Sequence, residues 1–176
     1  EILIGLVGSE MCIRDRCVAL SFMLSYIKLF SLPMGGSLTL CSMLPIVAYA
    51  CAFGPLYGFV AGLAFGMLQL IQDFYVIHWA QLLLDYFFAF ACYGIAAYFP
   101  GRLTLGVAVA GLCRMLCSTL SGGIFFADSA VDAGWSNAWL YSLAYNGSTI
   151  GAETVLCVLV SLLPPVKKVL GLMKSE

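Results

Sequence analysis

Apolar runs of helix length fill most of the chain, separated by short breaks that contain proline, glycine or charged residues. A helix that crosses a bilayer needs about 20 mostly apolar residues, and packed bundles tolerate shorter ones. The predicted helices cover residues 17–30, 38–53, 56–71, 76–99, 103–126 and 138–163. The pattern therefore predicts an all-α membrane protein, a bundle of about six transmembrane helices.

The composition supports this class. Hydrophobic residues make up 62% of the chain and charged residues 10%, whereas a soluble domain carries about 25% charged residues. The mean hydropathy is +1.02. A net charge of −1 provides no basic surface for nucleic acid. We expect the chain to lie in the lipid bilayer and to have no nucleic-acid partner.

The first sixteen residues have a different character. Residues 6–16 look like a translated sequencing-adaptor fragment, and Arg14 and Arg16 follow the apolar stretch that they would precede in a secretory signal. We therefore predict a non-native leader at 1–16, a transmembrane domain at 17–169 and a cytoplasmic tail at 170–176. The first transmembrane helix is then truncated.

The loop charges predict the orientation, because Lys and Arg are enriched in cytoplasmic loops. With the N-terminus inside, four basic residues lie in the cytoplasm: Arg102, Lys167, Lys168 and Lys174. On the outside are one basic residue, Lys28, and the acids Asp73, Asp128 and Asp132. Both termini are thus predicted to be cytoplasmic, and the polar loop 128–137 faces outward.

Three glycines four residues apart, Gly58, Gly62 and Gly66, occur in the third predicted helix. This spacing lets another helix approach closely. We favour packing inside the bundle over docking of another subunit.

The sequence contains none of the common catalytic or nucleotide-binding motifs, such as H-E-x-x-H, G-x-S-x-G or Walker A. Six of its eight cysteines lie inside apolar runs, there is no C-x-x-C pair, and His78 is the only histidine. We expect no catalysis, no cofactor and no metal. A bundle without an energy-coupling motif or internal repeat fits a binding subunit that depends on a partner.

Charged groups inside the membrane are costly and therefore mark candidate sites. Asp85, Arg114 and Glu153 fall within predicted helices, each on a polar stripe. Asp85 shares its face with Gln81 and is followed by three aromatic residues, so it could receive an organic cation. For Arg114 and Glu153 we favour a structural ion pair or snorkelling to an interface. An intramembrane enzyme using Asp85 or Glu153, and a purely structural protein, remain alternatives.

Four segments resemble the thiamine-specific substrate-binding (S) component of energy-coupling factor transporters, over residues 17–169. They are LPMGGSLTL at 32–40, QLLLDY at 81–86, LSGGIFF at 120–126 and WLYSLAYNGS at 139–148. The resemblance implies a six-helix bundle that captures thiamine from the outer face without changing it. It also implies two kinds of partner, a transmembrane coupling subunit and two ATPase subunits, in a bacterial plasma membrane.

The resemblance also implies the ligand-binding residues. Asp85 and Tyr86 match an acid–tyrosine pair of the family's fourth helix, and Tyr141 and Asn146 match pocket residues of its sixth. Other members carry a tryptophan in place of Phe126 and a histidine in place of Ser118. Some members also carry a tryptophan in place of Gly36. Because the histidine is replaced by Ser118, a related pyrimidine or thiazole compound is the alternative ligand. Ala19 matches a docking position of the first helix, and its partner position falls at Asp15.

Overall fold

The computed structural model describes residues 2–32 and 36–175, and the side chains of these except at 2–11, 167, 174 and 175. The predicted loop at Gly35-Gly36 and the motif around it therefore lie partly outside the described residues. Among the described residues, four continuous helical stretches are long and apolar enough to cross a membrane: Pro55–Gln72, Trp79–Tyr98, Leu103–Phe125 and Ala138–Ser161. The prediction of an all-α membrane protein is confirmed.

Helices α1 (Ile2–Ser25) and α2 (Leu44–Phe53) lie where the other two spans were predicted. Helix α2 is a short apolar helix, and α1 carries Glu10, Arg14, Asp15 and Arg16 near its middle. Because α1 begins at Ile2, it runs through the predicted leader into the first span. The origin of residues 1–16, and with it the truncation of the first helix, stays a prediction.

Two of the long stretches are not uniform α-helices. The fourth span consists of α4 (Trp79–Leu82), the π-helical η2 (Leu83–Phe88), α5 (Ala89–Ala91) and the 3₁₀-helical η3 (Cys92–Tyr98). The sixth consists of α8 (Ala138–Asn146), the π-helical η4 (Gly147–Gly151) and α9 (Ala152–Ser161). The third and fifth spans are the regular helices α3 (Pro55–Gln72) and α6 (Leu103–Phe125). π-Helical turns inside a longer helix are often found at functional sites, where they change the direction of side chains.

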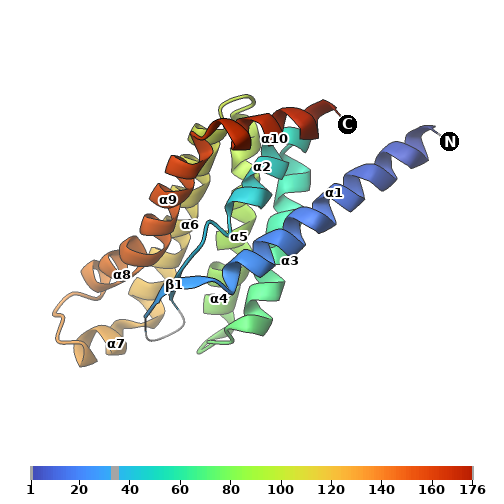
Figure 1. Cartoon of the computed structure of the whole chain (residues 1–176). Helices are drawn as coiled ribbons and strands as arrows, with labels where there is room; N and C mark the ends of the chain where they lie inside the picture. The colour runs from blue at the N-terminus through green and yellow to red at the C-terminus, as the bar shows by residue number, and fades with distance from the viewer. Residues whose placement is uncertain (1, 33–35, 176) are drawn as a thin grey trace.

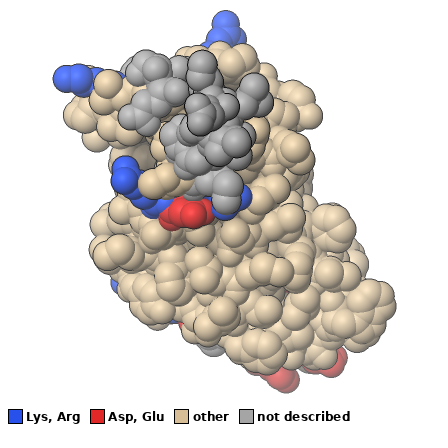
Figure 2. Space-filling model, turned by 90° about the vertical axis from the view of Figure 1, so that its right-hand side faces the viewer, with Lys and Arg blue, Asp and Glu red and all other residues tan. Residues whose placement is uncertain are grey.

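The two ends of the bundle differ (Figure 1). Both chain termini lie at one end, where α10 (Pro164–Ser175) crosses the bundle. The connection between α3 and α4, helix α7 (Ala127–Asp132) and a β-hairpin lie toward the other end. Most of the face drawn in Figure 2 is uncharged, as expected for a surface in contact with lipid.

The hairpin corrects the predicted ends of the first two helices. Strands β1 (Lys28–Ser31) and β2 (Ser37–Thr39) pair antiparallel, with Phe30 opposite Leu38. The prediction of helix at 28–30 and at 38–43 was therefore wrong. Short, largely apolar segments such as these can form either a helix or a strand. Pairing of the two strands also satisfies their backbone hydrogen bonds, which is important near a membrane surface.

Two further segments differ from prediction. The polar loop 128–137 contains helix α7 over its first half. The pair Pro164-Pro165 ends the sixth span as predicted, but it also begins α10. Proline is well tolerated in the first turn of a helix, where its missing N–H has no helical partner to lose.

The glycines of α3 pack inside the bundle, which confirms the favoured interpretation. A Cβ added at Gly58 would lie 2.9 Å from the Cα of Gly94 in η3. At Gly62 it would collide with the carbonyl oxygen of Phe90, and at Gly66 with that of Tyr86. Helix α3 therefore contacts the backbone of the fourth span directly.

We predict that Gly62→Ala lowers the free energy of unfolding by about 1–3 kcal/mol, because its methyl group has no room against the Phe90 carbonyl. Unfolding of the purified protein in detergent measures this. Gly171→Ala in α10 is the control, since nothing lies within 4 Å of its added Cβ. Equal stability of the two variants would contradict the close approach.

Candidate ligand-binding cavity

A cavity of about 160 Å³ lies among the hairpin, η2, α6, α8, η4 and α9. Its wall combines charged, polar and aromatic side chains with little aliphatic surface. The lining residues are Gly36, Ser37, Thr39, Ser42, Gln69, Asp73, Tyr75, Gln81, Asp85, Tyr86, Phe90, Arg114, Ser118, Gly122, Phe126, Tyr141, Ser142, Tyr145, Asn146, Thr149, Ile150 and Glu153. Such a set of polar groups within a membrane-spanning bundle indicates a site for a polar solute.

Asp85 is held in the cavity wall by uncharged donors. Gln81, one turn earlier, donates from Nε2 to Asp85 Oδ2 at 3.0 Å, so the predicted shared face is confirmed. Ser121 Oγ of α6 donates to the same oxygen at 2.8 Å. Among the residues that the structure describes, neither Lys nor Arg forms an ion pair with Asp85.

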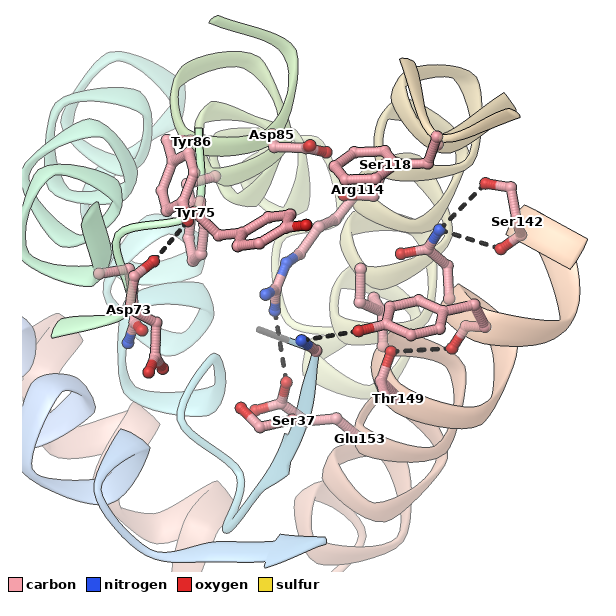
Figure 3. A pocket seen from close by; sticks show the side chains of 18 of the residues that line it. Ser37, Asp73, Tyr75, Asp85, Tyr86, Arg114, Ser118, Ser142, Thr149 and Glu153 are labelled. Carbon is pink, nitrogen blue, oxygen red and sulfur yellow. Dashed lines mark hydrogen bonds and ion pairs between the residues drawn. The ribbon is translucent and has the colours of Figure 1, made fainter. Parts of the chain in front are cut away.

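Arg114 and Glu153 form the structural ion pair favoured by the sequence, with 3.3 Å between Nη1 and Oε2. Arg114 Nη1 also donates to Tyr93 Oη at 2.6 Å, and its guanidinium carbon lies 4.5 Å from the ring centre of Phe90. Glu153 is only 2% exposed. Figure 3 shows Arg114 between Asp85 on one side of the cavity and Glu153 on the other.

Aromatic rings line part of the cavity. Tyr75, from the connection between α3 and α4, stacks on Phe126 with 5.9 Å between ring centres. Tyr86 donates its hydroxyl to the carbonyl oxygen of Asp73 at 2.6 Å. Tyr141 and Tyr145, one turn apart on α8, have ring centres 6.1 Å apart. Ring faces arranged in this way can attract a cation.

The structure brings all seven residues that the sequence singled out to this one cavity. Asp85 and Tyr86 come from η2, and the others come from the hairpin, α6 and its C-terminal end, and α8: Gly36, Ser118, Phe126, Tyr141 and Asn146. Asn146 Nδ2 donates to the carbonyl oxygen of Ser142 at 3.0 Å, which orients its amide. Their roles as ligand contacts stay a prediction.

Sequence reasoning missed several lining residues. Tyr145 follows Tyr141 by one helical turn, and that spacing could have identified it. Tyr75 could not be found in this way, because it lies in an irregular segment outside any helical period. Thr39 and Ser42 were missed because the segment was predicted to be helical.

In the described part of the chain, no group of three His, Cys, Asp or Glu residues lies close enough to hold a metal ion. All eight cysteines are free thiols. Cys92 and Cys117 have 3.8 Å between their sulfur atoms, too far for a disulfide bond. The groups available to a ligand in the cavity are thus charged, amide, hydroxyl and aromatic side chains.

A multi-pass helical bundle with one polar cavity between its helices defines a membrane protein that binds a small solute. Comparison with known sequences identifies the family. The sequence model described as "Thiamine transporter protein (Thia_YuaJ)" matches residues 15–172. The chain belongs to this family, which consists of transport proteins and not enzymes.

One relative supports this membership, and a solved structure supports the fold. The thiamine transporter ThiT of Bacillus subtilis (strain 168) is 31% identical over 147 residues, which cover 74% of this chain and 75% of the relative. A solved structure of ThiT from Listeria monocytogenes superimposes with a TM-score of 0.72. That match covers 90% of this chain and 96% of the other at 20% identity, so it supports the fold alone.

We predict that Arg114→Met lowers the free energy of unfolding by about 3–5 kcal/mol, because it leaves the buried Glu153 carboxylate without its cation. Unfolding of the ligand-free protein in detergent measures the loss. Lys28→Met is the matched control. It removes the salt bridge between Lys28 and Asp73, whose two side chains are each 31% exposed. The free energy of unfolding should therefore fall by less than about 1 kcal/mol. Similar losses in the two variants would show that burial does not distinguish these pairs.

Proposed function

We propose that the chain is the substrate-binding subunit of an ATP-driven vitamin importer and captures thiamine from the outer face of the membrane. The observation that carries this proposal is the carboxylate of Asp85 in the cavity wall, which forms no ion pair within the described part of the chain. Thiamine suits it because its thiazolium ring carries a permanent positive charge. Membership in the thiamine transporter family supports the same ligand.

The charges around the cavity favour a cationic ligand. Glu153 is paired with Arg114, and Asp73 is paired with Lys28 at 2.6 Å. Asp85 receives hydrogen bonds from the neutral side chains of Gln81, Ser121 and Ser118. A carboxylate in such a position gains most from a positively charged partner. The bound cation would balance the charge of the site.

The remaining predicted residues complete the proposed site. Tyr86 and Phe126 would supply ring contacts, with Tyr75 stacked beside Phe126. Tyr141 and Asn146 would hold the ligand by hydrogen bonds from α8. Ser118 and Gly36 would border it from α6 and from the hairpin.

We propose that residues 17–169 form the substrate-binding domain and that both termini are cytoplasmic, in a bacterial plasma membrane. The loop charges support this orientation. The hairpin and the α3–α4 connection, which contribute to the cavity, lie toward the end of the bundle opposite the termini (Figure 1). In this orientation the cavity faces the outside.

Energy for transport would come from other chains. We propose that a transmembrane coupling subunit and two ATPase subunits act with this chain, since its sequence contains no Walker A motif. ATP hydrolysis would reorient the loaded subunit in the membrane.

One departure supports a second ligand class. Ser118 lines the cavity where the resemblance implies a histidine, so this wall offers a smaller group without an imidazole nitrogen. A pyrimidine or thiazole precursor of thiamine is the alternative ligand.

Binding of thiamine to the purified protein tests the proposal. We expect Asp85→Asn to weaken binding about 30-fold or more, because it removes the charge of a partly desolvated pair while preserving shape. Asp128→Asn is the control. It makes the same chemical change at an exposed position on α7 and should leave the dissociation constant unchanged.

Unchanged thiamine binding by the Asp85→Asn variant would remove Asp85 from the site. Absence of binding to the unaltered protein would overturn thiamine as the ligand. Competition by the separate pyrimidine and thiazole halves then tests the alternative.

A further inference from the structure

Glu153 binds the turn that follows strand β2, although the two are more than a hundred residues apart in sequence. Its Oε1 accepts hydrogen bonds from Thr39 Oγ1 at 2.5 Å, Ser42 Oγ at 2.7 Å and the Ser42 backbone N–H at 3.0 Å. Thr39 and Ser42 are themselves buried, at 6% and 3% exposed. Helix α9 is thus connected to the base of the hairpin through one carboxylate oxygen.

The turn has an unfavourable backbone conformation. Cys41, between Thr39 and Ser42, has a φ of 56°, the only positive φ outside glycine among the described residues. A residue with a Cβ rarely adopts this conformation, and it persists where neighbouring contacts impose it. The three hydrogen bonds to Glu153 are such contacts. They hold the residues on both sides of Cys41.

The same turn connects directly to the edge of the cavity. Strand β2 begins at Ser37, and both Ser37 and Gly36 line the cavity. The Gly36 N–H donates to Tyr145 Oη at 2.9 Å, which fixes the other end of this short segment to α8. Displacement of the turn would therefore move a cavity edge made of only a few residues.

Glu153 has little capacity left for a ligand. Its Oε1 accepts from three donors and its Oε2 from Arg114, so only Oε2 keeps an acceptor position. Asp85 differs, since Gln81 and Ser121 donate to its Oδ2 and it forms no ion pair among the described residues. The two acids in one cavity therefore have different tasks.

We propose that Glu153 is a positioning residue: by holding the strained turn from Thr39 to Ser42, it fixes β2 and the Gly36–Ser37 edge of the cavity, and so slows release of the bound ligand. An edge that is already ordered does not have to be ordered on binding. Loss of this order raises the dissociation rate more than it lowers the association rate. The identity of the ligand rests on the proposed function, whereas the ordering of the edge does not.

The double variant Thr39→Val, Ser42→Ala tests this, because it removes both hydroxyl donors and leaves the Arg114–Glu153 pair in place. With thiamine as the probe, we expect the dissociation constant to rise about tenfold or more, mainly through faster dissociation. Amide hydrogen exchange of the ligand-free protein should accelerate at residues 36–44 and stay unchanged elsewhere.

Ser161→Ala is the matched control. Ser161 is fully buried on the same helix and donates to Thr104 Oγ1 at 3.0 Å, so its loss also breaks a hydroxyl contact between helices, but outside the cavity lining. We expect it to leave both thiamine kinetics and exchange at 36–44 unchanged.

Unchanged exchange at 36–44 in the double variant would overturn the proposal, as would acceleration spread evenly over the chain. Wild-type dissociation kinetics with accelerated local exchange would overturn the link to ligand release. If the unaltered protein does not bind thiamine, the proposed function fails, and the exchange comparison alone decides whether Glu153 orders the edge.

Discussion

Compensation of charge inside a membrane-spanning bundle is the constraint on which this structure depends. An ion taken out of water needs a partner of opposite charge, several hydrogen bonds, or both. Glu153 has both, in Arg114 and in the donors of Thr39 and Ser42. Asp85 has only neutral donors in the described structure. The difference separates a structural acid from a candidate ligand-binding acid within one cavity.

The backbone around the cavity is not regular α-helix at several of the positions that direct polar groups into the cavity. The π-helical η2 contains Asp85 and Tyr86, and the π-helical η4 follows Asn146 directly. The hairpin adds a non-helical edge that is hydrogen-bonded to α8 and α9. The glycines of α3 bring that helix into backbone contact with the fourth span, at Phe90 and Tyr86 among others. Because Phe90 and Tyr86 also line the cavity, close packing on one side of the fourth span accompanies an opening on the other.

Much of this could be predicted from the sequence. The long apolar runs with Pro and Gly breaks predicted α3, α6 and the fourth and sixth spans, because hydrophobicity and helix breakers are local properties. The polar stripes predicted that Asp85, Ser118 and Asn146 face the interior, since a helix that is polar on one side must turn that side away from lipid. Their convergence on one cavity was predicted only with the help of a family resemblance.

The rest depends on contacts that no local pattern records. Residues 28–31 and 37–39 mix apolar side chains with Lys, Ser and Thr, a pattern too short to distinguish helix from strand, and they form strands by pairing with one another. Cys41 has a left-handed φ that its own sequence does not favour, and its neighbours Thr39 and Ser42 are held by a distant glutamate. Tyr75 reaches the cavity from an irregular connection. Such features follow from tertiary structure.

A crystal structure of the protein bound to thiamine tests the central claim most directly. The account predicts thiamine between Asp85, Tyr141 and Asn146, with a positively charged ring within about 6 Å of the Asp85 carboxylate and the Arg114–Glu153 pair intact. Thiamine bound elsewhere, or a ligand that pairs with Glu153 while Asp85 stays without a partner, would contradict it.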